Sequence, residues 1–218
     1  MKSNIVALLV AGVCGMASLQ AHAAASYCSA GSPHADRLSL SDMTLNSTNS
    51  SDCYGVVSGN INDEADLNNL GLTWGTDFIE IGNTDGSLSG SFMGLNFVLS
   101  GPSKKDKLGT WTLNITDGND DAPLNLPANL DIVAALKASD RYALYQFDDI
   151  EVVDGVNTGD WAIKFLNNGG QIPGLSHFMV FVREGEGGGG GDEVPEPGSL
   201  ALLGLGLAGL AALRRRRA

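Results

Sequence analysis

The stretch TWTLNI, residues 110–115, alternates apolar and polar side chains with a period of two. The same alternation occurs in WAIKF (161–165) and in HFMVFVR (177–183), where Phe178, Val180 and Val182 occupy every second position. A period of two predicts β-strands with one face buried and the other exposed.

Turn-forming segments rich in Gly, Asn, Asp and Pro separate these strands from further strand candidates. They are NTDG (83–86), GPSKKDK (101–107), DGNDDAP (117–123), VDGVNTGD (153–160) and NNGGQIPG (167–174). Many short strands without an internal repeat favour an all-β fold, a single jelly-roll-like β-sandwich over residues 24–186. We also expect strands over 72–81 and 132–138, and one short helix over 61–71 with Asn62 as its N-cap.

The N-terminus has the order of a secretory signal. Lys2 precedes the apolar run IVALLVAGVCGMASL, and Ala21 and Ala23 supply the small residues of a cleavage site. This order predicts a signal peptide over residues 1–23 that signal peptidase removes.

The mature chain is strongly acidic. The whole sequence has 13 Lys+Arg and 25 Asp+Glu; setting aside Lys2 and the four C-terminal arginines leaves 8 basic residues and a net charge of −17. A surface of this charge repels nucleic acid and anionic lipid, so no nucleic-acid partner is expected.

Two cysteines remain once Cys14 leaves with the signal peptide. Cys28 and Cys53 are an even pair in an exported chain, which predicts a disulfide between them. A bridge over this separation is worth about 3 kcal/mol in loop entropy.

The C-terminal segment has three parts. A Gly-rich run (187–193) predicts a flexible linker, and VPEP follows it at the start of a tail over 194–218. The apolar stretch 198–213 is short for a membrane-spanning helix. The arginines after it place the C-terminus on the cytoplasmic side.

This order resembles the PEP-CTERM sorting tail of Gram-negative bacteria, which is also catalogued under the label ice-binding protein C-terminal domain. The matching residues are Val194, Pro195, Glu196 and Pro197, the apolar run, and Arg214, Arg215, Arg216 and Arg217. The resemblance implies export, transient membrane anchoring and processing by exosortase, a membrane peptidase. It also implies a final place on the outer surface or in the extracellular matrix, with a link to exopolysaccharide and biofilm.

The middle of the chain offers little chemistry. Ser176 and His177 are neighbours on opposite faces of a strand, so they cannot act as nucleophile and base, and no catalytic residue or cofactor is assigned. Glu80, Asp148, Asp149 and Glu151 are expected to be solvated charges at strand ends. Asp117, Asn119 and Asp121 begin like a calcium loop, but Ala122 and Ala128 stand where such a loop needs Gly and Glu, so a turn is the other interpretation and no metal is assigned.

The sequence therefore predicts an exported, exosortase-sorted surface or matrix protein with a non-catalytic structural or interaction role. One alternative is a carbohydrate-binding module for the cell's own exopolysaccharide, which would need Trp74, Trp111 or Trp161 on the surface rather than in the expected core positions. Another is a matrix-acting hydrolase, which would need two convergent carboxylates in a cleft.

Overall fold

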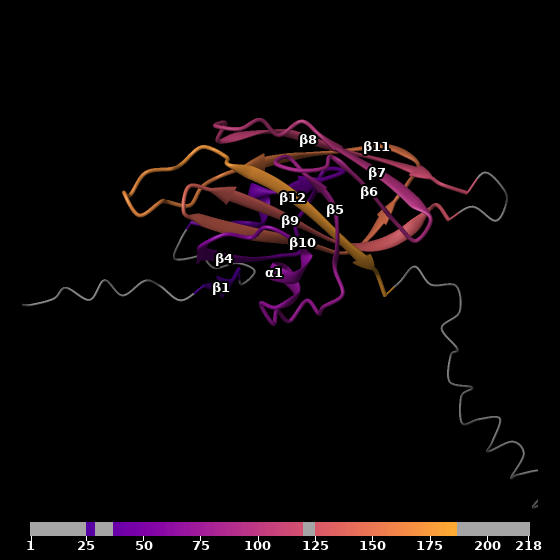
Figure 1. Ribbon diagram of the computed structural model, residues 1–218, viewed down its shortest axis with the longest axis horizontal. Coiled ribbons are helices and arrows are strands. Elements are labelled where there is room, and N and C mark those ends of the chain that lie inside the picture. Colours follow the sequence, from indigo (N-terminus) through magenta and orange to yellow (C-terminus); the bar gives the residue numbers. More distant parts are fainter. Residues whose placement is uncertain (1–24, 29–36, 120–124, 187–218) are drawn as a thin grey trace, which may run out of the picture.

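The computed structural model describes residues 25–28, 37–119 and 125–186 (Figure 1). The predicted signal peptide, the glycine linker and the whole C-terminal tail lie outside the described residues. So do Val194, Pro195, Glu196 and Pro197, and Arg214, Arg215, Arg216 and Arg217.

The described chain is built almost entirely from two antiparallel sheets. Sheet A has the strand order β1 (Ser26–Tyr27), β4 (Asp52–Ser58), β10 (Arg141–Val152), β9 (Ala128–Ala138), β12 (His177–Glu184) and β5 (Ile79–Asn83). Sheet B has the order β11 (Gly155–Ala162), β8 (Leu108–Asp117), β7 (Leu95–Ser100) and β6 (Ser89–Phe92). The remaining elements are the hairpin β2 (Thr44–Leu45) and β3 (Thr48–Asn49), the 3₁₀ helix η1 (Leu40–Asp42) and α1 (Glu64–Asn68).

Strand pairing is nested along the chain. β9 pairs with β10, the flanking strands β8 and β11 pair with each other in the other sheet, and the strands β5 and β12 pair in sheet A. The chain therefore passes between the sheets from β5 to β6, from β8 to β9, from β10 to β11 and from β11 to β12. This topology confirms the all-β prediction.

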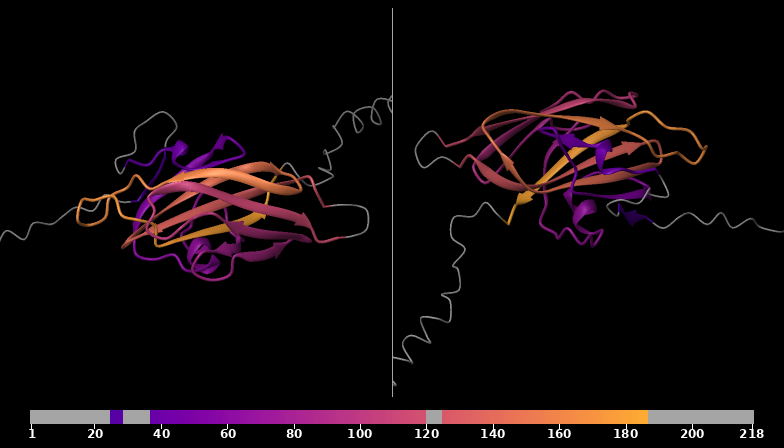
Figure 2. Two further views of the ribbon diagram at one scale, coloured as in Figure 1. Left: turned by 90° about the horizontal axis from the view of Figure 1, so that it is seen from above. Right: turned by 180° about the vertical axis from the view of Figure 1, so that it is seen from behind.

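Three layers stack on one another (Figures 1 and 2). Sheet B covers one face of sheet A, and the apolar side chains of both sheets form the larger core. The segment 61–78, which includes α1 and which we call the cover segment, packs on the opposite face of sheet A. Its side chains in this second core are Ile61, Leu67, Leu72, Trp74 and Phe78.

Both faces of the central strands are consequently buried. In β12, Phe178, Val180 and Val182 enter the core between the sheets, while Met179 and Phe181 enter the core under the cover segment. The prediction of one exposed face is therefore wrong for β12. It holds for β7 and β8 of sheet B, whose side chains alternate between buried and solvent-accessible.

Polar contacts fasten the cover segment to sheet A. The His177 imidazole Nε2 lies 2.9 Å from the Ile61 carbonyl oxygen, and the Trp74 indole donates to Asp52 at 3.0 Å. The Arg183 guanidinium lies over the Phe78 ring, 5.0 Å from its centroid, and forms an ion pair with buried Asp131. These contacts satisfy polar groups that the cover segment would otherwise bury without partners.

Two local predictions in this region need correction. α1 begins after Asp63, whose side chain accepts the Asp66 backbone N–H at 2.9 Å, so Asp63 and not Asn62 is the N-cap. The strand expected over 72–81 starts only at Ile79. Leu72 and Trp74 are buried because they pack from a loop onto sheet A, and burial alone does not distinguish a loop from a strand.

The outer face of sheet B is exposed and nearly free of charge. Registers across the four strands place polar, uncharged and aliphatic side chains side by side on it. Its solvent-accessible members are Ser89, Ser91, Asn96, Val98, Ser100, Leu108, Thr110, Thr112, Asn114, Thr116, Val156, Thr158, Asp160 and Ala162.

One glycine permits a close approach at the edge of this sheet. The Trp111 indole donates a 2.9 Å hydrogen bond to the Thr44 carbonyl of β2, directly beside Gly159 of β11. A Cβ at Gly159 would lie 1.8 Å from that carbonyl oxygen. Hairpin β2–β3 can therefore close this end of the larger core only because residue 159 has no side chain.

The two-core arrangement predicts the effect of Phe181→Ala. Phe181 is fully buried beneath the cover segment, so its truncation should lower the free energy of unfolding by about 3–5 kcal/mol, measured by urea denaturation. Val98→Ala, on the exposed face of sheet B, should change it by less than about 0.5 kcal/mol. Similar small effects for both variants would contradict a core on this side of sheet A.

Candidate functional site

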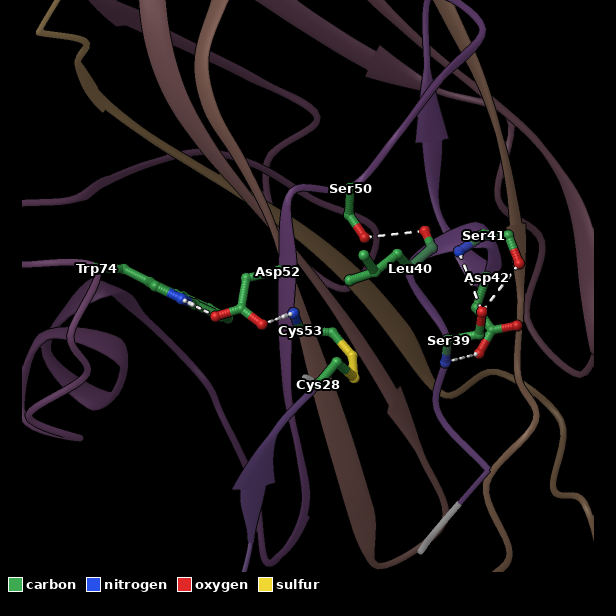
Figure 3. Close-up of a disulfide and its surroundings, with 9 residues drawn as sticks. All are labelled: Cys28, Ser39, Leu40, Ser41, Asp42, Ser50, Asp52, Cys53 and Trp74. Carbon is green, nitrogen blue, oxygen red and sulfur yellow. Dashed lines mark hydrogen bonds between the residues drawn. A yellow bond between two sulfur atoms is a disulfide. The ribbon is translucent and has the colours of Figure 1, made fainter. Parts of the chain in front are cut away.

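The predicted disulfide is present. Cys28 and Cys53 are bonded, with their Cα atoms 5.0 Å apart, and the Cys28 N–H donates to the Cys53 carbonyl at 2.7 Å (Figure 3). The neighbouring Asp52 carboxylate accepts the Cys53 N–H at 2.8 Å and the Trp74 indole N–H at 3.0 Å. Two neighbouring residues of β4 therefore fix two other segments: Cys53 bonds the N-terminal segment, and Asp52 binds the cover segment.

The sequence did not predict an open cleft of about 320 Å³ where η1 meets the end of sheet B. Asp42 of η1 and both Asp160 and Trp161 of β11 are among the residues that line it. η1 forms here because Ser39 and Asp42 make a capping box: the Ser39 N–H donates to Asp42 Oδ2 at 2.8 Å, and the Ser39 hydroxyl accepts the Ser41 N–H at 3.4 Å (Figure 3). The signal was available as Ser-x-x-Asp, a capping-box pattern.

Asp42 is the most perturbed carboxyl group near this cleft. Burial raises its pKa from 3.8 to about 6, against the opposing effects of the Ser39 N–H and the Lys164 charge. The group is therefore a proton donor at mildly acidic pH. A carboxyl group with a raised pKa in a cleft is a feature of many acid–base sites, and also of buried structural carboxyl groups.

Two buried donors lie near Asp42. Burial raises the pKa of the Tyr145 hydroxyl well above 10, and the adjacent Asp42 carboxylate adds to the shift. Neither the Tyr145 hydroxyl nor the Trp161 indole nitrogen makes a hydrogen bond of acceptable geometry within the described chain. Asp42 and Trp161 line the cleft, and the buried Tyr145 hydroxyl lies beside Asp42.

The calcium-loop candidate lies at a second open cleft, of about 450 Å³, which Asp117, Glu151 and Asp154 help to line. Asp117 accepts the Asn119 N–H at 2.9 Å and also the Asn125 backbone and side-chain N–H groups, which lower its pKa. Asp121 lies outside the described residues. Among the residues that are described, no group of three or more His, Cys, Asp or Glu side chains is placed to hold a metal ion.

Ser176 and His177 have different partners. The Ser176 hydroxyl accepts the Ser139 N–H at 3.2 Å. His177 Nδ1 lies 3.4 Å from Asp85, and Nε2 contacts the cover segment. The imidazole therefore fastens the cover segment, and the structure does not bring it to a serine nucleophile.

The other acidic candidates gather in two places. Burial and the neighbouring Glu64 raise the pKa of Glu80 on the side of the cover segment. Burial raises the pKa of Asp148, and the carboxylates of Asp131, Asp149 and Glu186 raise it further. Carboxylates thus concentrate where the described chain ends after β12.

All three tryptophans are buried, as the sequence predicted. Trp111 and Trp161 lie in the core between the sheets, and Trp74 lies under the cover segment. The large apolar side chains exposed in the described chain are Ile79, Leu88, Met93, Val98, Leu108, Val153 and Val156, none of them aromatic. No tryptophan is therefore available on this surface to stack on a sugar ring.

Comparison with known families identifies the C-terminal segment. Residues 193–217 match the PEP-CTERM protein-sorting motif. The tail is a PEP-CTERM sorting signal. No curated protein and no solved structure matches the chain.

The PEP-CTERM motif implies an exported protein that carries a membrane-anchoring tail and is processed by exosortase. Within residues 25–28, 37–119 and 125–186, no helix is long and apolar enough to cross a membrane. The short membrane helix predicted over 198–213 belongs to the PEP-CTERM tail, outside those ranges.

The raised pKa of Asp42 predicts a pH-dependent stability. Because the folded pKa of about 6 exceeds the unfolded value of 3.8, this carboxyl group stabilises the fold at low pH and loses that contribution as the pH rises through 6. Compared with Asp42→Asn, the wild type should gain about 1–2 kcal/mol between pH 7.5 and pH 4.5, measured by urea denaturation. Ser39→Ala, which removes the other half of the capping box but no titrating group, should shift stability by the same amount at both pH values. A stability difference between wild type and Asp42→Asn that does not vary with pH would contradict the prediction.

Proposed function

We propose that the protein is exported, sorted by exosortase and displayed on the cell surface or in the extracellular matrix, where it has a structural or interaction role without catalysis. The single observation that carries this proposal is the PEP-CTERM motif at 193–217. We include a role in exopolysaccharide or biofilm, which the same class of tail suggests.

The arrangement of the chain ends supports display. β1 and the C-terminal end of β12 lie in different halves of the sandwich along its long axis (Figures 1 and 2). The described chain ends at Glu186, and the sorting motif begins seven residues later. An anchor attached here would leave the opposite end of the sandwich farthest from the membrane.

Charge near this end also supports display. The carboxylates around Asp148, including Asp149 and Glu186, lie on the side to which the tail is attached. An anionic lipid surface would repel this end of the domain. The segment between the domain and the membrane would then stay accessible to a peptidase.

The jelly-roll-like nesting of β5·β12, β8·β11 and β9·β10 suits a stable scaffold with exposed faces. The carbohydrate-binding alternative needs exposed aromatic rings, and the burial of Trp74, Trp111 and Trp161 counts against it. We therefore favour interaction through the faces of the sheets over sugar stacking.

A matrix-acting hydrolase is the second candidate, because Asp42 and Asp160 line one cleft and the Asp42 pKa is about 6. In such an enzyme Asp42 would donate a proton and Asp160 would act as base or nucleophile. If this activity exists, Asp42→Asn and Asp160→Asn should each reduce release of reducing ends from the cell's exopolysaccharide by at least about 100-fold. Because we propose a role without catalysis, we expect the wild type to release no reducing ends, and the two variants are needed only if it does.

Sorting is tested on the exported protein itself. In cells with exosortase, the mature protein should lack Arg214–Arg217 by intact mass and should leave the membrane fraction. Without exosortase, or with Pro195, Glu196 and Pro197 all changed to Ala, it should keep its tail and stay in the membrane. Asp192→Ala, outside the matched residues, should be processed normally. If the protein kept its intact tail in every strain, the tail would act only as a membrane anchor, and the proposal of sorting by exosortase would be contradicted.

A further inference from the structure

β12 fixes the point at which the chain leaves the sandwich. It pairs with β9 on one side and with β5 on the other, and its last residue, Glu184, lies opposite Leu130 of β9. The Gly185 N–H then donates to the Asn129 carbonyl at 3.0 Å. The end of β12 cannot separate from the sheet without breaking these contacts. The folded domain therefore lends no chain to the segment that leads to the sorting motif.

Carboxylates surround this exit point. Asp148, Asp149 and Glu186 are exposed, and we call them the exit carboxylates. A Cβ at Gly185 would lie 2.8 Å from Asp149 Oδ1, so that carboxylate lies directly against the departing chain. Burial raises the pKa of Asp148, and the charges of Asp149 and Glu186 contribute to the increase, which places all three groups close together. The domain thus presents negative charge on the side to which its tail is attached.

The sequence between the exit and the motif is short. Residues 187–193 separate Glu186 from Val194, and 187–191 are five consecutive glycines. A Gly-rich chain of this length has a root-mean-square span of about 15 Å and a maximum span of about 25 Å. The field of exposed charges decays over about 8 Å at physiological ionic strength. The available span therefore exceeds the distance over which an anionic lipid surface repels the exit carboxylates.

We propose that the exit carboxylates make removal of the tail depend on the length of chain between Glu186 and Val194. The VPEP segment has to lie at the membrane, where a membrane peptidase can bind it. A shorter connection would bring the exit carboxylates against anionic lipid, and their repulsion would draw VPEP away from the peptidase. Chain length and charge are then interchangeable, since fewer carboxylates permit a shorter connection.

This inference rests on the proposed sorting by exosortase and adds a requirement that the folded domain places on that reaction. It is tested in cells with exosortase, using the full chain. The measurement is the rate at which pulse-labelled protein loses its tail, with intact mass to identify the product.

Deletion of residues 187–191 leaves two residues before Val194, or about 7 Å of extended chain. Tail removal should slow at least about tenfold, because a linker that cannot span two sites reduces their effective concentration almost to zero. Five serines in place of the five glycines keep the length and should change the rate by less than about twofold. Five additional glycines should slow removal by about twofold at most, since effective concentration falls only gradually with length.

Neutral substitutions test the part played by charge. In the deletion variant, Asp148→Asn combined with Glu186→Gln should restore the rate to within about threefold of the wild type. Asp106→Asn combined with Asp140→Asn is the matched control and should restore nothing. These two acids lie at the other end of sheet A: Asp140 is in the turn between β9 and β10, and the Asp106 carbonyl accepts the Leu175 N–H just before β12 begins.

Removal of the tail from the deletion variant at the wild-type rate would overturn the proposal, as would equal rates after the two pairs of substitutions. Thermal melts should be the same for the deletion variant and the wild type, because the deleted residues lie outside the sandwich. A wild type that keeps its tail would refute sorting by exosortase and this inference with it. Equal processing of the wild type and the deletion variant would refute only the dependence on length.

Discussion

The structure depends on one constraint: the central strands of sheet A are apolar on both faces. β9, β10 and β12 cannot leave either face in water, so sheet B must cover one and the cover segment the other. Because burying apolar surface is the main driving force of folding, this double coverage fixes the order of the three layers. The contacts of His177, Asp52 and Arg183 then secure the cover segment where apolar packing alone would allow it to shift.

Sequence patterns predicted the features that depend on local periodicity or on cysteine pairing. The all-β class, the strand at 110–115 and the Cys28–Cys53 bond are all present. Sequence patterns did not predict the burial of side chains that are covered by a segment distant in sequence. Met179 and Phe181 lie on a face that looks available to solvent until the cover segment, about a hundred residues away in sequence, packs on it. The Asp42 cleft was missed for the same reason, because its walls come from η1, β8 and β11.

Function divides between two parts of the chain that follow different physical rules. The PEP-CTERM tail is a linear signal, whose meaning lies in the order of its residues and can be recognised without a fold. No curated protein and no solved structure matches the sandwich, whose surface is characterised by its charge and exposure. The acidic end near β12 is one region of this surface, and the Asp42 cleft is another, which Leu108, Thr110 and Asp160 of the nearly uncharged face of sheet B help to line.

The position of β12 relates folding of the sandwich to export of the PEP-CTERM tail. β12 is the last strand of the described residues, yet it lies in the interior of sheet A between β9 and β5. A chain leaving the export channel N-terminus first cannot complete this sheet until residue 184 has emerged, only nine residues before the sorting motif begins. Sheet A is therefore completed only shortly before the sorting motif leaves the channel. A chain truncated before β12 would lack both the complete sheet and the sorting motif.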